Sequence, residues 1–383
     1  MAKTPIDEAR VHAWLTELFE DDLHAQRVLS LSHITLGVIH AASLGIHAIG
    51  RALADARGTL SKHAVKQVDR FLSNEGIDVS QLAMHWVPFV LGERPEALIS
   101  FDWTEFAKDG QTTLVASLIT THGRATPLLW HTADKSALKG MRADIEDAVL
   151  ARLRQVIPRE VRVTLLADRG FADHKLFAHL AELGFDYVIR IPEKTQVRDA
   201  DGRAQRAGFW VPKNGRSLML KAAAVTEQEL PIGAFVGVKK AKMKEPWCLV
   251  TSLADSTAAQ VVNLYARRFT IEESFRDVKD IKFGLGLSAT HIKSPARRDR
   301  LLLVSALAMA LLTLLGAAGE AIGIDKYWKA NTSKKRQHSL FRQGCNYYSA
   351  LPNMRPAFLE PLTIKFAELV RAQPIFREAL GLI

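Results

Sequence analysis

Residues 161–168 have the sequence Val-Arg-Val-Thr-Leu-Leu-Ala-Asp, and residues 97–102 have the sequence Ala-Leu-Ile-Ser-Phe-Asp. Each run is short and apolar, which is typical of a buried β-strand, and each ends in a carboxylate. Acids at the ends of separate strands of one sheet are a recurring arrangement of ligands for hard cations such as Mg²⁺. We therefore expect Asp102 and Asp168 to be metal ligands, although either acid alone would be better explained as a solvated residue at a sheet edge.

The segments around these two runs predict an α/β fold. Two β-rich runs follow Asp102 and are separated by His122-Gly123, which predicts a hairpin. An amphipathic helix precedes the strand that ends at Asp168, and a further helix and strand follow it. This order of strands and helices predicts a layered α/β arrangement with a mixed sheet. We expect these elements at residues 113–121, 125–131, 136–156, 173–183 and 187–191.

The following segments predict a β-rich insertion and then helices. Residues 192–246 are polar, basic and strand-like, with turns typical of hairpins. A short strand at 247–252 is followed by a long helix from Ser256 to about Ile281. Two more helices are expected at 293–320 and 357–380.

Residues 1–90 follow a helical pattern and contain a candidate DNA-binding motif. After a glycine-containing break, Ser61 is the expected N-cap of a basic helix with Lys62, Lys66 and Arg70 on its outward face. Helix, turn and basic helix are typical of a helix-turn-helix, whose second helix contacts DNA. A small helical bundle without DNA contacts gives a similar pattern, so this alternative stays open.

The 383-residue chain has a formal net charge of +10, which favours a polyanionic partner such as nucleic acid or an anionic membrane surface. Basic residues are concentrated in 203–244 and 326–342. Such clusters are typical of proteins that contact the DNA backbone, and a solvated basic surface is the alternative. The two cysteines, Cys248 and Cys345, lack metal-site spacing, which indicates a reducing cytoplasm and no thiolate metal site.

Residues 301–319 carry no charge, and this stretch is long enough to span a membrane. It is rich in Ala, Gly, Ser and Thr, and no second span is found in the sequence. We therefore interpret it as a buried core helix, with a membrane helix as the alternative.

The long helix carries polar and aromatic side chains along one side. At about 100° per residue, five positions share a stripe about 80° wide, while Glu273 lies outside it. Helical geometry thus selects Glu272, rather than Glu273, as the inward acid. A solvent face with ion pairs four residues apart is the alternative, but it does not explain Tyr265. The stripe consists of Tyr265, Arg268, Glu272, Arg276 and Lys279.

The spacing Y-x₂-R-x₃-E-x₆-K, which begins at Tyr265, resembles the signature of the insertion-sequence-4 family of bacterial DDE transposases. Asp102 lies in Phe-Asp-Trp-Thr, which is similar to the first acid of that family. Asp168 lies in Ala-Asp-Arg-Gly-Phe-Ala-Asp, which is similar to the second. The third acid corresponds to Glu272, and the resemblance runs from about residue 40 to about residue 345.

The resemblance implies that Asp102, Asp168 and Glu272 bind two Mg²⁺ ions, which Mn²⁺ can replace. The implied reaction is hydrolysis at transposon ends, a hairpin intermediate and strand transfer into target DNA. The implied partners are double-stranded DNA with terminal inverted repeats, target DNA and a second copy of the chain in a synaptic dimer. The implied location is the cytoplasm, beside the nucleoid and without a membrane.

The implied fold is a ribonuclease-H-like core interrupted by the β-rich insertion and flanked by helical regions. The predicted regions are a helical DNA-binding region (1–90), the first part of the core (91–191), the insertion (192–246), the second part of the core (247–320) and a helical C-terminal region for dimerisation or DNA contact (321–383).

Several side chains are expected to contact DNA. Arginine and lysine on the signature helix complement phosphate oxygens near the cut. Trp247 resembles a tryptophan on which hairpin-forming members stack a flipped base, and a core tryptophan is the alternative. Phe269 stands where the best-known relative has another tryptophan. The candidate contacts are Tyr265, Arg268, Arg276, Lys279, Trp247, Lys62, Lys66, Arg70, Lys239, Lys240, Lys242 and Lys244.

Three other functions stay open from the sequence. An enzyme of the same fold could cleave nucleic acid without joining it. A DNA-binding regulator descended from a transposase would have lost catalysis, although its acids would then not need to be intact. A membrane protein could be built around residues 301–319.

Overall fold

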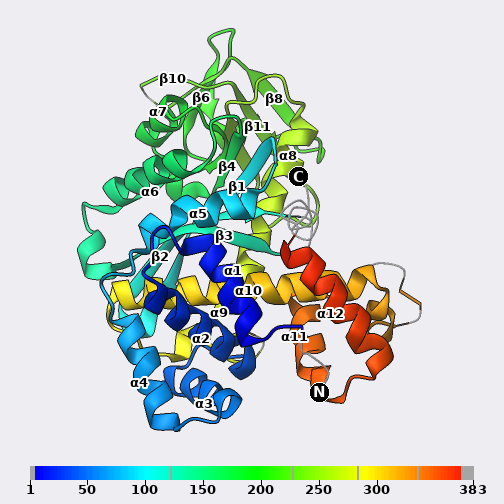
Figure 1. Cartoon of the computed structure of the whole chain (residues 1–383). Helices are drawn as coiled ribbons and strands as arrows, with labels where there is room; N and C mark the ends of the chain where they lie inside the picture. Colours follow the sequence, from blue (N-terminus) through cyan, green and yellow to red (C-terminus); the bar gives the residue numbers. More distant parts are fainter. Residues whose placement is uncertain are drawn as a thin grey trace.

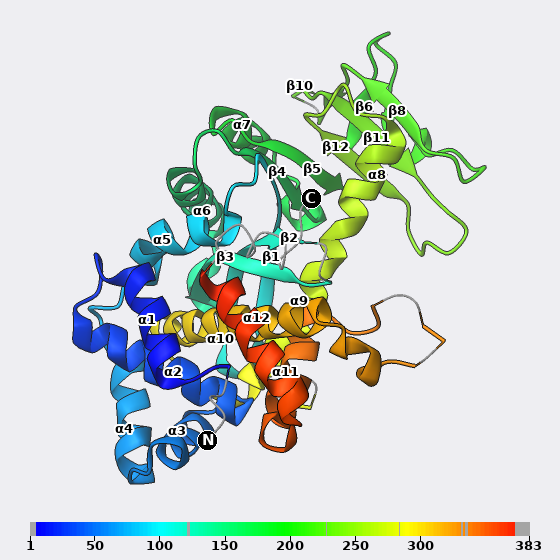
Figure 2. The same cartoon turned by 45° about the vertical axis from the view of Figure 1, so that its right-hand side comes forward.

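The computed structural model describes residues 5–120, 123–226, 228–282, 284–330, 332–333 and 336–371. Among these residues, a large mixed sheet lies at the centre of the molecule with helices packed around it (Figure 1). Figure 2 shows the helical N-terminal and C-terminal regions at one end and the β-rich part at the other. His122, Lys334, Lys335 and the end of the helix expected at 357–380 lie outside the described residues.

The central sheet has eight strands in the order β3-β2-β1-β4-β5-β12-β11-β8. β1 pairs antiparallel with β2 and parallel with β4, and β4 pairs parallel with β5. The predicted mixed sheet is therefore confirmed. The strands are β1 (Glu96–Phe106), β2 (Gln111–Ile119), β3 (Ala125–Asp134), β4 (Arg162–Ala167), β5 (Asp186–Ile191), β8 (Leu218–Lys221), β11 (Ala234–Val238) and β12 (Trp247–Thr251).

The segment 192–246 contributes strands to two sheets. β8 and β11 extend the central sheet through antiparallel pairs from β5 to β12 and from β12 to β11. A separate four-stranded sheet has the order β10-β9-β6-β7. Two strands of this segment thus belong to the central sheet, and its other four strands form the small sheet. The small sheet consists of β6 (Gln196–Arg198), β7 (Ala204–Arg206), β9 (Ala224–Val225) and β10 (Leu230–Pro231).

The N-terminal region is helical in the described residues, and acidic side chains cap two of its helices. Asp7 accepts a hydrogen bond from the Arg10 amide, and Asp78 accepts one from the Ser80 amide. Ser61, the expected N-cap, is instead the first helical residue after Leu60. The helices are α1 (Glu8–Phe19), α2 (Ala25–Ala41), α3 (Ile46–Arg57), α4 (Ser61–Leu72) and α5 (Val79–Leu91).

The helix expected from 256 to 281 is interrupted. A 3₁₀ turn, η5 (Arg267–Phe269), separates α8 (Ala258–Ala266) from α9 (Thr270–Lys279). Because a 3₁₀ turn advances about 120° per residue, side chains on either side of it do not keep the angles of one straight α-helix. The remaining helices around the sheet are α6 (Arg142–Val156) and α7 (His174–Glu182).

The core is organised along one long apolar helix, α10 (Pro295–Ala321). Its most apolar 18-residue window has a mean hydropathy of 2.4, and it is the single straight helix in the described chain that is long and apolar enough to cross a membrane. In its most apolar window 89% of the residues are buried inside the protein, which favours the core-helix interpretation. The pair α2 and α3 passes the same test together but is bent by 99°.

The C-terminal region packs on α10. Gly344 lies so close to α10 that a Cβ there would overlap the Leu312 carbonyl, and Gly316 lies equally close to the Leu340 carbonyl. Glycine at these crossings lets the two backbones touch. The elements are η7 (Ile324–Trp328), α11 (Leu340–Ala350), η8 (Leu351–Asn353) and α12 (Pro356–Arg371).

The first turns of α10 hold the sheet through two buried charged residues. The Arg298 guanidinium is fully buried and donates to Asp109 at 2.6 Å and to Gln111 at 2.6 Å, in the turn from β1 to β2. The Asp299 carboxylate accepts a hydrogen bond from the Thr132 hydroxyl on β3 at 2.5 Å. These contacts fix the start of α10 against the first three strands.

The neighbouring arginines hold the N-terminal helices to the same point. Arg300 donates to the carbonyls of Leu72 at 2.9 Å and Ile77 at 3.1 Å, between α4 and α5. Arg297 donates to the Asp69 carboxylate of α4 at 2.7 Å. Four consecutive residues of α10 therefore join the sheet to the N-terminal region.

Asp299 should make stability depend on pH. Burial raises its pKa from 3.8 to about 7, with hydrogen bonds from Thr132 and the nearby arginines acting in the opposite direction. A raised pKa contributes stability that is complete below the unfolded pKa and is lost as pH rises through about 7. Asp299→Asn should therefore flatten the fall in free energy of unfolding between about pH 4 and about pH 7, measured by denaturant titration. An equal fall in the free energy of unfolding in wild type and variant would contradict this prediction.

Candidate active site

Two of the three predicted acids lie side by side on adjacent parallel strands. Phe101 of β1 is paired with Ala167 of β4, so Asp102 and Asp168 are the next residues on each strand. Asp168 follows the end of β4, and its carboxylate accepts a hydrogen bond from the Gly170 amide at 2.7 Å. β1 continues to Phe106, so the prediction that Asp102 ends its strand is wrong.

Arg268 joins the first acid to the third. Its guanidinium donates to Asp102 at 2.9 Å and to Glu272 at 3.3 Å. Arg268 is 6% exposed, whereas the Glu272 side chain is 55% exposed. The Nε atom of Arg268 is buried and has no hydrogen-bond partner among the described residues. One buried cation therefore lies between two carboxylates that are 170 residues apart in the chain.

The charges of the acids act on one another. Burial raises the pKa of Asp102 from 3.8 to about 6; Arg268 opposes this shift, and the charge of Asp168 adds to it, with a smaller contribution from Glu272. Burial opposes a charged Arg268, but Tyr265 and the three acids outweigh it and raise the pKa of Arg268. The site is thus a concentration of negative charge around one arginine.

The donor set fits a hard divalent cation. Asp102, Asp168 and Glu272 offer only carboxylate oxygens, which Mg²⁺ and Mn²⁺ accept. In the described residues, however, no group of three or more His, Cys, Asp or Glu side chains is already arranged to hold a metal ion. Arg268 supplies the positive charge between Asp102 and Glu272 in this arrangement. Metal and guanidinium would therefore compete for the same oxygens.

Aromatic rings surround the arginine. Trp247, at the start of β12, stacks on Phe269 with ring centroids 5.9 Å apart and meets Tyr265 edge-on at 5.0 Å. The Arg268 guanidinium lies 5.0 Å from the centre of the Phe269 ring. Tyr265 is fully buried, Trp247 is half-buried against the same apolar cluster, and Phe269 is 41% exposed. Trp247 is thus part of the core and also a neighbour of the acids.

The other two residues of the predicted stripe point in different directions. The Lys279 ammonium donates to the Thr104 hydroxyl at 3.1 Å and to the Glu105 carbonyl at 2.6 Å, on β1 beyond Asp102. Burial lowers the pKa of Lys279. Arg276 instead pairs with Glu273 on the outer side of α9. The single stripe expected from an ideal helix is therefore divided.

The remaining predicted DNA contacts are exposed side chains in two places, α4 and the loop between β11 and β12. Lys62, Lys66 and Arg70 are exposed on α4, where a hollow is lined by Arg27, His63, Lys66 and Arg70. The basic loop between β11 and β12 leads directly to Trp247. Its exposed lysines are Lys239, Lys240, Lys242 and Lys244.

Three residues beside the acids carried no signal in the sequence. Glu245, in the basic loop, accepts hydrogen bonds from Arg190 at 2.7 Å and from Arg169 at 3.1 Å. Arg169 directly follows Asp168, so this contact ties the loop to the turn that carries the second acid. These residues are far apart in the chain and belong to no common motif.

Comparison with known families gives the class of the protein. Residues 118–311, about half of the chain, match the family described as the transposase DDE domain. The match contains Asp168 and Glu272, whereas Asp102 lies before it. No curated protein matches the chain.

The chain belongs to the transposase DDE domain family. It is therefore a DDE transposase, a metal-dependent DNA-cutting enzyme whose substrate is DNA. The eight-stranded mixed sheet with its surrounding helices is consistent with the ribonuclease-H-like fold of these enzymes.

Removal of the arginine charge should strengthen metal binding in the absence of DNA. In Arg268→Gln, Asp102 and Glu272 lose their counter-ion and become free to bind a cation. The rise in melting temperature caused by Mn²⁺ should then be larger than in wild type, because the variant binds Mn²⁺ with several-fold higher affinity. Lys279→Gln is the control, because it removes one positive charge near the site, and Lys279 contacts none of the three acids. Equal metal-induced shifts in wild type and Arg268→Gln would show that Arg268 does not compete.

Proposed function

We propose that this transposase cuts the ends of a mobile element of the insertion-sequence-4 type, with Asp102, Asp168 and Glu272 as the metal ligands. The observation that carries the proposal is the arrangement of these acids about Arg268, which β1, β4 and α9 bring together. Mg²⁺ is the expected ion, with two ions per site and Mn²⁺ as a substitute. Bound divalent ions would activate the attacking water and stabilise charge on the phosphate oxygens.

The side chains around the acids would bind and orient the DNA strand. Arg268 contacts two of the acids, and Lys279 contacts β1 beyond Asp102; each can exchange a protein oxygen for a phosphate oxygen of DNA. Hydrolysis would free a 3′-hydroxyl at the element's end. Attack of this hydroxyl on the opposite strand would form a hairpin, and after its opening the same group would join target DNA.

Other surfaces would supply affinity for the DNA backbone. The lysines between β11 and β12 lie next to Trp247, and Lys66 and Arg70 on α4 line a separate basic hollow. Arg276 would add a further contact if it exchanged Glu273 for a phosphate. Two copies of the chain would hold two ends in a synaptic complex, as expected for a reaction that joins both ends to one target.

Substitution of the acids tests the assignment of the catalytic centre. Asp102→Ala, Asp168→Ala and Glu272→Ala should each abolish cleavage, since each removes a metal ligand, and each should leave DNA binding largely intact because Lys and Arg contacts dominate affinity. Glu273→Ala, on the outer side of α9, should be much milder. The measurement is nicking of a plasmid that carries the gene with its natural flanking DNA, beside a gel-shift assay. Near-normal nicking by Glu272→Ala in Mg²⁺ would refute the assignment.

Trp247 tests the hairpin step. If hairpin formation requires a base to leave the stack, stacking on the indole can return about 1–3 kcal/mol of the cost. Trp247→Ala should therefore slow hairpin formation on a pre-nicked end more than the first nick on an intact end. Because Trp247 also packs on Tyr265 and Phe269, the melting temperature of the Trp247→Ala protein is measured in parallel. Equal slowing of both steps with a large loss of stability would leave Trp247 with a core role alone.

A further inference from the structure

The helix that carries Glu272 is attached to the sheet through its opposite face. The Ser274 hydroxyl lies 2.8 Å from the Ala125 amide and 3.0 Å from the Ala125 carbonyl, at the start of edge strand β3. Five residues after Glu272, Asp277 is about 140° away around the helix, and Ser274 is about 160° away. The contacts that Ser274 and Asp277 make are thus on the side of α9 that faces away from the acids.

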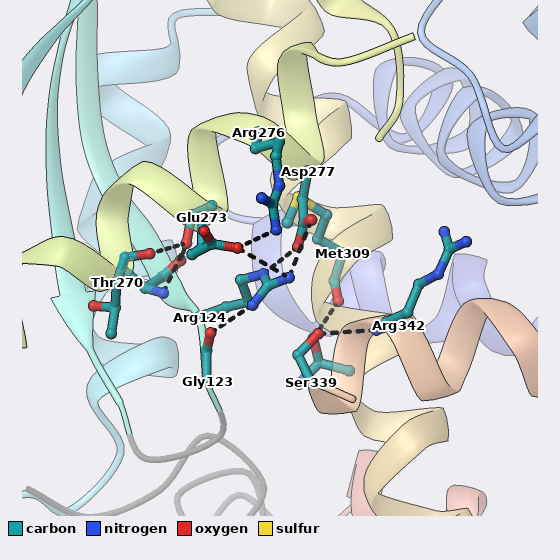
Figure 3. Close-up of polar contacts among 12 residues, drawn as sticks. Gly123, Arg124, Thr270, Glu273, Arg276, Asp277, Met309, Ser339 and Arg342 are labelled. Carbon is teal, nitrogen blue, oxygen red and sulfur yellow. Dashed lines mark hydrogen bonds and ion pairs between the residues drawn. The ribbon is translucent and has the colours of Figure 1, made fainter. Parts of the chain in front are cut away.

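An ion pair between Arg124 and Asp277 is the strongest of these attachments. Both Nε and Nη2 of Arg124 donate to the Asp277 carboxylate, the second at 3.3 Å to Oδ1 (Figure 3). The side chains are 16% and 7% exposed. A two-pronged arginine–carboxylate contact fixes both distance and orientation, which a single apolar contact does not. Burial raises the pKa of Asp277, although Arg124 acts in the opposite direction.

The backbone of Asp277 is held as well as its side chain. Its carbonyl accepts a hydrogen bond from the Leu285 amide at 2.7 Å. Gly284 lies so close to this carbonyl that a Cβ there would overlap it. Asp277 is therefore held by Arg124, just before β3, on one side and by the returning chain on the other.

We infer that Arg124 and Asp277 are positioning residues, which set the rotation and height of α9 so that Glu272 faces Asp102 and Arg268. The inference rests on the proposed role of Glu272 as the third acid. A well-packed apolar pair would hold the helix at no lower stability than a buried ion pair, so what the charges add is defined geometry. A small displacement of a catalytic group is costly, because a shift of about 1 Å can slow a reaction about 100-fold.

The test uses the full chain and a plasmid that carries the gene with its natural flanking DNA. Asp277→Asn and Arg124→Gln should each slow nicking about 10- to 100-fold and raise the Mg²⁺ concentration for half-maximal rate. DNA binding without metal should stay unchanged, since neither residue reaches the DNA in the proposal. The double variant should be no slower than either single variant, because each single substitution already removes the ion pair. Arg124→Lys keeps the charge without the fork and should recover part of the rate.

Asp325→Asn is the matched control, since it removes a half-buried ion pair with Lys329 on η7, which packs against α10. It should lower the melting temperature without changing the Mg²⁺ midpoint. If the Arg124 and Asp277 variants behave like this control at equal folded fraction, the pair is structural and the inference is wrong. If Asp277→Asn does not fold, the rate and Mg²⁺ midpoint of Arg124→Lys decide in the same way. Glu272→Gln separates the two proposals: if it still nicks DNA, the third-acid assignment fails first.

Discussion

The buried first turns of α10 are the constraint on which the rest of the structure depends. A long apolar helix can slide or rotate in a core that offers only non-directional contacts, whereas buried charges demand particular partners. Arg298 and Asp299 bind the first three strands, and Arg297 and Arg300 bind the N-terminal helices. Along its later turns, α10 also supports α9, because Leu302 and Met309 line a small apolar cavity together with Phe275 and Val278. Contacts with α10 and with the start of β3 thus hold α9, the helix that carries Glu272.

Charge balance then decides the state of the candidate active site. Three carboxylates brought within electrostatic range of one another need positive charge, and Arg268 supplies it from a buried position where each interaction is strong. The aromatic rings of Tyr265 and Phe269 lie within 5.9 Å and 5.0 Å of this guanidinium. A phosphate that drew Arg268 away would at the same time release oxygens of Asp102 and Glu272. DNA and metal would therefore favour each other's binding without a large change of the fold.

The sequence predicted a mixed sheet because alternating and continuous apolar runs report burial directly, but it did not predict that β8 and β11 from the segment 192–246 extend this sheet. It also predicted the enzyme class, since the acids and the signature spacing are local patterns. It did not predict the break at Arg267–Phe269, because a 3₁₀ turn has no distinct composition. The contact of Arg124 with Asp277 was equally invisible, because 153 residues separate the partners and either charge could have been solvated. The roles assigned to the site residues stay predictions, whereas the neighbourhood of Asp102 and Asp168 follows from strand register alone.

Core and active site are not separate parts of this enzyme. Trp247 packs against the apolar cluster behind the sheet, yet its ring also stacks on Phe269, which contacts Arg268. The same tryptophan ends the basic loop, which Glu245 ties to Arg169 beside Asp168. A DNA strand bound to this loop would lie next to both the aromatic pair and the second acid. Any movement of the loop would be transmitted to Asp168 through one ion pair and to Arg268 through two stacked rings. Affinity for DNA, position of the acids and stability of the sheet edge therefore depend on overlapping sets of contacts.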